Sequence, residues 1–198
     1  NDHLYFVIGD VSGKGVPASL FMAITRSLFR TLSQHVLSPA KIVTEMNNSI
    51  SDNNESNMFV TLIVGILDLE TGILKLCNAG HNPPILIYPD GQVSYLEFKT
   101  QIFVGVVEDF KYSDEEVVLE KESKLFLYTD GVTEAENINK ELYGEEKLLE
   151  MLSDNASSDV RTTVNVVVDS IASHVKEAEA SDDLTILLIQ YEPGTANS

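Results

Sequence analysis

Apolar and polar residues alternate along the chain in short blocks, and these blocks predict most of the secondary structure. A continuous apolar run at 4–8 predicts a first strand. The run at 58–68 is apolar on both alternating faces and rich in β-branched residues, so we expect a central strand buried on both sides. Turn residues at 70–72 and 90–91 predict hairpins. Further strands are predicted at 73–78, 84–88, 92–98, 116–119, 124–129 and 184–191.

Four other segments have the 3.6-residue period of helices. In the first, at 16–35, Leu20, Ile24, Leu28 and Leu32 are four residues apart. Phe21, Met22 and Phe29 widen that face, so we expect the helix to be well buried. Ser38 is the predicted N-cap of a second helix that runs to about residue 51. The other two helices are predicted at 144–152 and 160–175, whereas 100–110 is ambiguous. Hairpins and helices in separate blocks predict an α+β fold with antiparallel sheets.

The net charge of the chain limits the classes of partner that it is expected to bind. Thirteen Lys and Arg face 31 Asp and Glu over 198 residues, a formal net charge of −18. Such a balance excludes nucleic acid and an anionic membrane surface as main partners, because both repel an acidic protein. It suits divalent cations, although most of these acids are expected on a solvated surface. The length is enough for one large domain.

Three features of the sequence indicate the cellular compartment in which the protein is expected. Cys77 is the single cysteine, so there is no internal disulfide, and this fits a reducing cytoplasm. The longest apolar run, 58–67, is too short to span a bilayer, and no signal-peptide pattern is present. We therefore expect a cytoplasmic domain. The chain begins at Asn1, directly before a strand, and we interpret it as a piece of a longer polypeptide, which upstream segments could anchor to a membrane.

The stretch GDVSGKG at 9–15 joins the first strand to the first helix. It places Asp10 at a strand end, where a carboxylate can hold a metal, although such an Asp can also bond only to nearby backbone amides. The stretch is not a phosphate-binding P-loop. Only three residues separate Gly9 from Gly13, and Lys14 is followed by glycine instead of a hydroxyl residue.

Two other acidic sites share the context of Asp10. Asp130 ends the strand at 124–129 and precedes a glycine, and Asp182 and Asp183 open the last strand. Strand-end carboxylates that are far apart in sequence can converge at one edge of a sheet structure. Hard oxygen ligands of this kind favour Mg²⁺ or Mn²⁺. Together the three sites predict a metal centre.

Four motifs then carry a family resemblance. They are GDVSGKGVPASLFM at 9–22, NAGHNPP at 78–84, YTDGVTEA at 128–135 and SDDLT at 181–185. In this order they resemble the bacterial RsbU/SpoIIE group of the metal-dependent protein phosphatase 2C superfamily, over essentially the whole chain. The resemblance implies a four-layer α/β/β/α sandwich of two antiparallel sheets flanked by helices at 1–192. We expect a disordered tail at 193–198.

The resemblance also implies a two-metal site that holds Mn²⁺ or Mg²⁺. Asp10 matches the carboxylate that bridges both metals, and the Val11 carbonyl matches a ligand of one. Asp130 and Asp182 match ligands of the other metal. Asp183 stands where relatives outside this group often carry Asn, and it is a further candidate ligand. Two such metals can clamp a phosphate and activate a water molecule, so no protein nucleophile is required.

Two further residues are candidates for accessory roles, and the chain differs from the family pattern in one respect. His81 is expected to stiffen its loop, with proton donation to the leaving serine or contact with an accessory metal as the alternative. Lys14 could contact phosphate or be a solvated turn residue. Relatives carry a Gly-Gly-Asp-type strand upstream of GDVSGKG, and this chain begins after it. We therefore expect the chain to lack its first strand or strands and to hold one cation or none, compared with two in the intact protein.

The resemblance implies a phosphoserine/phosphothreonine protein phosphatase of partner-switching signalling, which regulates sigma factors. Its implied substrate is a phosphorylated anti-sigma-factor antagonist of the STAS type, and its implied controller is an upstream sensor or receiver domain of the same polypeptide. A catalytically weak pseudo-phosphatase that only binds a partner is the alternative. A Ca²⁺-stabilised binding module is a third interpretation, but no EF-hand loop is present. The resemblance leaves open whether the protein forms a homodimer.

Overall fold

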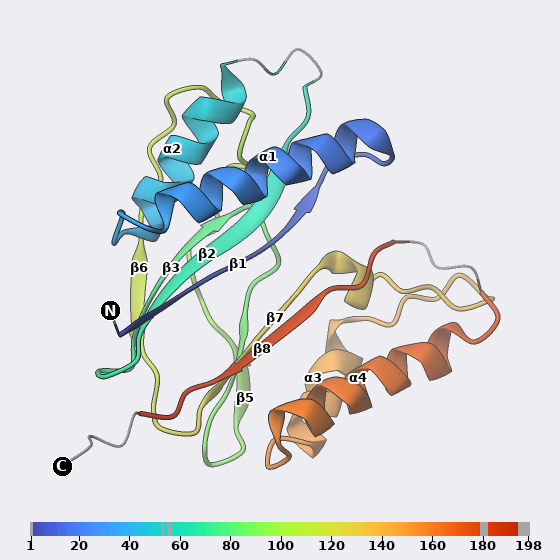
Figure 1. The fold of residues 1–198 in the computed structure, drawn as a ribbon. Coiled ribbons are helices and arrows are strands. Elements are labelled where there is room, and N and C mark those ends of the chain that lie inside the picture. Colours follow the sequence, from blue (N-terminus) through green and yellow to red (C-terminus); the bar gives the residue numbers. More distant parts are fainter. Residues whose placement is uncertain (1, 53, 55–56, 179–181, 194–198) are drawn as a thin grey trace. The chain divides into compact units, whose positions relative to one another are not determined.

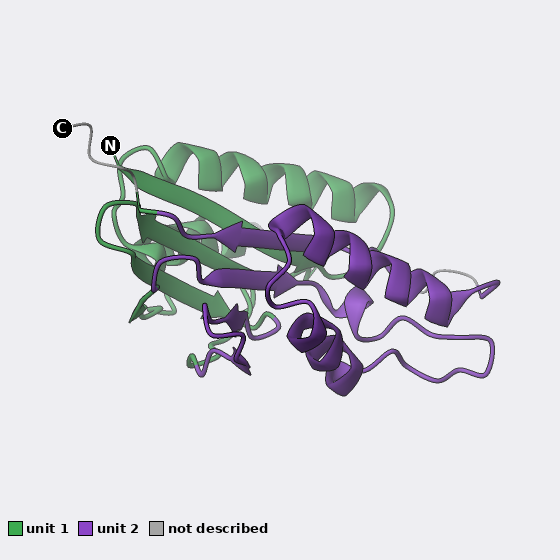
Figure 2. Cartoon of the chain, turned by 90° about the horizontal axis from the view of Figure 1, so that it is seen from below, with its two compact units in different colours: residues 1–81, 98–119, 193–198 green, residues 82–97, 120–192 purple. Residues whose placement is uncertain are grey.

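The computed structural model describes residues 2–52, 54, 57–178 and 182–193, and the chain divides into two compact units. Unit 1 comprises Asn1–His81, Phe98–Leu119 and Pro193–Ser198, and unit 2 comprises Asn82–Glu97 and Glu120–Glu192. Figure 2 colours the two units separately. Each unit is built on one antiparallel four-stranded sheet that carries two α-helices (Figure 1).

The sheet of unit 1 has the strand order β1-β2-β3-β6. Its strands are β1 (His3–Val11), β2 (Val60–Asp68), β3 (Ile73–Ala79) and β6 (Glu115–Val118). Strand β2 is buried on both alternating faces, because Leu62, Ile63 and Val64 are all 0% exposed. The expectation of a central strand is therefore confirmed. Strand β1 forms one edge of this sheet.

Helix α2 (Pro39–Ser51) supplies the main helical contribution to the core of unit 1. It begins where the sequence predicts, with the Ser38 hydroxyl accepting a hydrogen bond from the Lys41 N–H at 3.2 Å. Ile42, Val43 and Met46 are fully buried on its inner face and pack beside β2 and β3. The helix therefore covers the sheet with one continuous apolar face.

Helix α1 (Val16–Leu32) corrects one expectation. Leu20 and Ile24 are 62% and 54% exposed, so two of the four residues that define the predicted buried face lie on the surface. The other two, Leu28 and Leu32, pack on the core as predicted, together with Ala18, Phe21 and Phe29. The helix packs mainly against α2 and the edge strand β1. Such neighbours cover only a narrow stripe of a helix, and the rest of its apolar surface stays in contact with solvent.

The sheet of unit 2 has the strand order β5-β4-β7-β8. Its strands are β4 (Ile85–Ile87), β5 (Val93–Tyr95), β7 (Lys124–Tyr128) and β8 (Ile186–Gln190), and its helices are η1 (Asp130–Val132), α3 (Glu145–Asp154) and α4 (Val160–Val175). Helices α3 and α4 pack on each other and on this sheet. Phe126, Leu148 and Val167 are 0–1% exposed in its core.

The fold class is thus confirmed as α+β with two antiparallel sheets and four α-helices. The ambiguous segment at 100–110 contributes Val104, which exchanges two backbone hydrogen bonds with Val60. The predicted tail lies mostly outside the described residues. None of the helices in the described part of the chain combines the length and apolarity needed to cross a membrane.

Candidate metal centre

Asp10 lies near the end of β1, half-buried and paired across the sheet with Thr61 of β2. The residue before it allows this close pairing. A Cβ atom on Gly9 would lie 2.6 Å from the carbonyl oxygen of Thr61, so only glycine fits there without displacing β2. Because residue 9 has no side chain, β1 stays paired with β2 up to Asp10, and the carboxylate therefore lies near the end of the strand.

The turn that follows Asp10 is held by one hydroxyl. The backbone N–H of Ser12 donates to the carbonyl of Phe59 at 2.9 Å, and the N–H of Phe59 donates to the Ser12 side-chain oxygen at 2.9 Å. The chain then bends through Gly13 and Gly15, whose φ angles of 85° and 81° favour glycine. This turn positions the Val11 carbonyl and leaves Lys14 exposed to solvent.

His81 is buried in unit 1, at 4% exposure, and is held at its ring and its backbone. Its Nδ1 atom lies 2.9 Å from the Thr61 hydroxyl oxygen, and the same hydroxyl lies 3.5 Å from the Asp10 carbonyl oxygen. The Asn78 side chain accepts from the His81 N–H at 2.8 Å and donates to the His81 carbonyl at 3.0 Å. The NAGHNPP motif therefore builds a turn that fixes His81 next to the strand pair that carries Asp10.

Asp130 follows β7 in unit 2 and begins the short helix η1. Its carbonyl accepts from the Glu134 N–H at 2.8 Å and from the Thr133 hydroxyl at 3.3 Å. Tyr128, just before the motif's threonine, is 1% exposed, and burial raises the pKa of its phenol. Tyr128 is thus a core residue, and Asp130 is the candidate metal ligand of this motif.

The segment that carries Asp182 and Asp183 lies directly against the turn after Asp130. A Cβ atom on Gly131 would be 2.3 Å from the carbonyl oxygen of Asp183, so the two backbones touch. The Thr129 hydroxyl donates to that same carbonyl at 3.2 Å. The Asp182 carboxylate accepts from the Asp183 N–H at 2.8 Å. Two of the three predicted acidic sites are therefore joined by backbone contacts within unit 2.

The candidate ligands are divided between the two units. Asp10 and Val11 belong to unit 1, whereas Asp130, Asp182 and Asp183 belong to unit 2. Across the described ranges, no three His, Cys, Asp or Glu side chains are grouped closely enough to hold a metal. The donor set itself fits a hard divalent cation, because it consists of carboxylate oxygens and one backbone carbonyl.

Three supporting residues were not singled out from the sequence. Ser12, Thr61 and Thr129 each bring a hydroxyl to a strand end that carries a candidate ligand. Their signal was present, because Ser12 and Thr129 stand within two residues of the Asp in their own motifs. Hydroxyl residues are common in turns, however, and only the tertiary contacts distinguish these three from the others.

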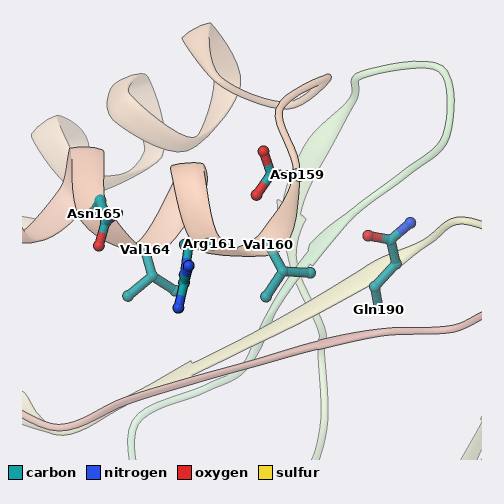
Figure 3. Close-up of a pocket in the computed structure, with 6 residues that line it drawn as sticks. All are labelled: Asp159, Val160, Arg161, Val164, Asn165 and Gln190. Carbon is teal, nitrogen blue, oxygen red and sulfur yellow. The ribbon is translucent and has the colours of Figure 1, made fainter.

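A cavity of about 640 Å³ lies elsewhere in unit 2, between the start of α4 and the end of β8 (Figure 3). It is lined by Asp159, Val160, Arg161, Val164, Asn165 and Gln190. None of the candidate ligands lines it. The Asp159 carboxylate caps α4 by accepting from the Thr162 N–H at 3.0 Å, so its role there is structural.

Cys77 is excluded as a nucleophile, and this gives a first testable prediction. The thiol is 1% exposed, and burial raises its pKa to about 12. About one thiol in ten thousand is then ionised at pH 8, and the thiolate is the reactive form. We expect Ellman's reagent to leave the native chain unmodified at pH 8 and to label one thiol per chain in denaturant. Rapid labelling of the native protein would contradict the assignment of Cys77 to the core.

Two curated bacterial proteins are similar to the chain over nearly its whole length. It is 27% identical to Protein IcfG of Synechocystis sp. over 216 residues, covering 96% of this chain and 34% of that protein. It is 25% identical to the phosphoserine phosphatase RsbU of Bacillus subtilis over 190 residues, covering 96% of this chain and 56% of that protein. The chain thus spans between a third and just over half of the length of these relatives.

A solved structure agrees with the observed architecture. The crystal structure of the RsbU and RsbW domains of Rv1364c from Mycobacterium tuberculosis matches with a TM-score of 0.81 and 24% identity, over 98% of this chain and 53% of that chain. This likeness shows the fold. The family model described as Stage II sporulation protein E matches residues 1–192, nearly the whole chain. The chain therefore belongs to the SpoIIE family.

Proposed function

We propose that this chain is the catalytic domain of a metal-dependent phosphoserine/phosphothreonine protein phosphatase in bacterial partner-switching signalling. The observation that carries the proposal is the contact between the two acidic segments of unit 2. Gly131 packs on the Asp183 carbonyl, and the Thr129 hydroxyl donates to it. Asp130 follows Thr129 directly, so this backbone contact makes the two segments that carry candidate carboxylate ligands neighbours, as a shared cation requires.

Asp10, Asp130 and Asp182 would hold divalent cations, with the Val11 carbonyl and Asp183 as further ligands. In the longer polypeptide we propose two Mn²⁺ or Mg²⁺ ions, and one or none in these 198 residues. When bound, such cations supply charge stabilisation for the phosphoryl group and an activated water molecule. The net charge of −18 favours their accumulation near the protein.

The chain's own residues then have separable tasks. Gly13 and Gly15, with positive φ angles, let the chain turn directly after β1, which would leave the Asp10 carboxylate and the Val11 carbonyl able to bind a ligand. The Thr61 hydroxyl, 2.9 Å from His81 Nδ1, fixes the orientation of the imidazole ring. His81 could then hold a proton for the leaving serine, and exposed Lys14 could contact a phosphate oxygen.

The proposed substrate is a phosphorylated anti-sigma-factor antagonist of the STAS type. Among the relatives, RsbU is described as a phosphoserine phosphatase. We test the proposal by incubating the chain, within its longer polypeptide, with a phosphoserine-bearing antagonist and following phosphate release. Activity should require Mn²⁺ or Mg²⁺ and should disappear with a chelator. Metal-independent hydrolysis would contradict the proposed chemistry.

A pseudo-phosphatase that only sequesters its partner is the second candidate. Its specific support is the absence of a group of three metal-binding side chains among the described residues. The two candidates differ in one measurement. A binder retains the phosphorylated antagonist and releases no phosphate at saturating Mn²⁺, whereas an enzyme turns it over.

The exposed face of α1 predicts how an upstream sensor or receiver domain controls the site. Leu20 and Ile24 are more than half exposed, on a helix that begins one residue after the Asp10 turn ends. Apolar residues held on the surface favour a protein partner. We expect Leu20→Ser combined with Ile24→Ser to reduce stimulated activity in the longer polypeptide while changing the free energy of unfolding by only about 0.5 kcal/mol.

The matched control is Leu28→Ser on the inner face of the same helix. Leu28 packs on the core of unit 1, so its replacement should lower the free energy of unfolding by about 1–2 kcal/mol. Activity assays with and without the upstream domain separate the two effects. Unchanged stimulation in the Leu20/Ile24 double variant would mean that regulation enters through another surface.

A further inference from the structure

The hydroxyl of Thr129 makes two hydrogen bonds to the segment at 182–185, which carries Asp182 and Asp183 and leads into β8. It donates to the Asp183 carbonyl at 3.2 Å and accepts from the Thr185 N–H at 3.1 Å. The residue is 3% exposed, so water does not substitute readily for either bond. The Thr129 hydroxyl therefore uses its donor and one acceptor position to hold one short segment, residues 183–185.

The backbone explains why a side chain is needed at this point. Strands β7 and β8 pair up to Tyr128 and Ile186, and the ladder continues with the Thr129 N–H donating to the Thr185 carbonyl at 3.1 Å. In an antiparallel pair the Thr129 carbonyl would accept in return. That carbonyl instead accepts from the Val132 N–H at 3.0 Å, because the chain turns into η1. The hydroxyl replaces it as acceptor for β8.

Thr129 therefore has two structural roles at the end of β7. Its carbonyl starts the turn that presents Asp130, and its hydroxyl keeps the segment with Asp182 and Asp183 attached. Gly131 completes the arrangement, because its missing Cβ lets the turn lie against the Asp183 carbonyl. A buried hydroxyl with both bonds satisfied holds its neighbours in one geometry, and its loss leaves the partner groups unsatisfied.

We propose that Thr129 is a positioning residue that sets the spacing between Asp130 and the Asp182–Asp183 segment, and through it the affinity of the site for a divalent cation. The inference rests on the proposed metal-dependent function. Groups that orient metal ligands typically change metal affinity by about 10–100-fold when they are removed. Thr129 acts through the ligands and is not itself assigned as one.

The test compares Thr129→Val, which keeps the shape and loses both hydrogen bonds, with Thr129→Ser, which keeps the hydroxyl. Mn²⁺ binding is measured by calorimetry in the longer polypeptide, and amide exchange of Thr185 is measured in the same protein without metal. We expect Thr129→Val to weaken Mn²⁺ binding about tenfold or more and to accelerate exchange at Thr185. Thr129→Ser should remain close to wild type in both measurements.

Thr163→Val is the matched control for stability. Thr163 is a fully buried threonine of unit 2 whose hydroxyl donates to the Asp159 carbonyl at 3.0 Å, within α4. It should lower the melting temperature to a similar degree as Thr129→Val and leave Mn²⁺ affinity unchanged. A purely structural role for Thr129 predicts that the two variants behave alike, and that result would overturn the inference.

Gly131→Ala carries the test if Thr129→Val does not fold. It removes no hydrogen-bonding group, but its Cβ would push the Asp183 carbonyl away from Thr129, so Mn²⁺ binding should weaken again. Unchanged affinity in Gly131→Ala would count against fixed spacing. Failure of the wild-type longer polypeptide to bind Mn²⁺ would refute the proposed function instead. The exchange of Thr185 in metal-free protein would still decide whether Thr129 holds the two segments together.

Discussion

Asp10→Asn is expected to abolish nearly all metal-dependent phosphatase activity of the longer polypeptide, lowering kcat/KM by about a thousandfold. The change replaces one carboxylate oxygen with an amide and keeps the shape of the side chain. Asp10 is the candidate ligand shared by both cations, so both lose affinity at once. A thousandfold loss corresponds to about 4 kcal/mol of transition-state stabilisation, a reasonable share for metal catalysis.

The fold should survive this substitution, because Asp10 is half-buried at the end of β1 and its backbone pairing with Thr61 does not involve the carboxylate. Phosphate release is measured with a phosphoserine protein at several Mn²⁺ concentrations, and circular dichroism monitors folding. Asp169→Asn, an exposed position on α4, is the matched control and should be fully active. Near wild-type turnover by Asp10→Asn would remove the basis for a bridging carboxylate.

Asn78→Ala is expected to produce the largest loss of stability among the motif residues, about 2–4 kcal/mol. Asn78 is 3% exposed, and its amide satisfies both the N–H and the carbonyl of His81. His81 is itself buried, so truncation leaves two backbone groups without their partner. Each buried group that loses its hydrogen bond costs about 1–3 kcal/mol.

Urea denaturation of the metal-free chain measures this loss. Asn78→Asp keeps the acceptor for the His81 N–H but buries a carboxylate against the His81 carbonyl, so a loss at least as large as that of Asn78→Ala is expected. Asn165→Ala, at an exposed site on α4, should change the free energy of unfolding by about 0.5 kcal/mol or less. If Asn78→Ala is no worse than Asn165→Ala, the NAGHNPP motif is not the structural turn described above.

The elements that the sequence predicted best are those whose signal is local. The doubly apolar strand at 58–68, the Ser38 cap and the hairpin turns depend on neighbouring residues, and all appear in the structure. The same holds for Asp130, because a strand followed by Asp and Gly is visible without any tertiary information, whereas Asp182 and Asp183 lie a few residues before β8 and not at its start. Residues 100–110 were ambiguous because their bridge partners, Val60 for Val104 and Asn78 for Thr100, are remote in sequence.

The amino-acid sequence by itself determined the order of strands and helices, the fold class and the candidate ligands Asp10, Asp130, Asp182 and Asp183. The tertiary structure alone decided which face of α1 is buried, because periodicity shows that a helix is apolar but not how much of it its neighbours cover. It also decided the role of Thr129, whose partner Asp183 is 54 residues away. Hydrogen bonds between distant segments leave no local pattern, so only the folded chain reveals which hydroxyl holds two strands together.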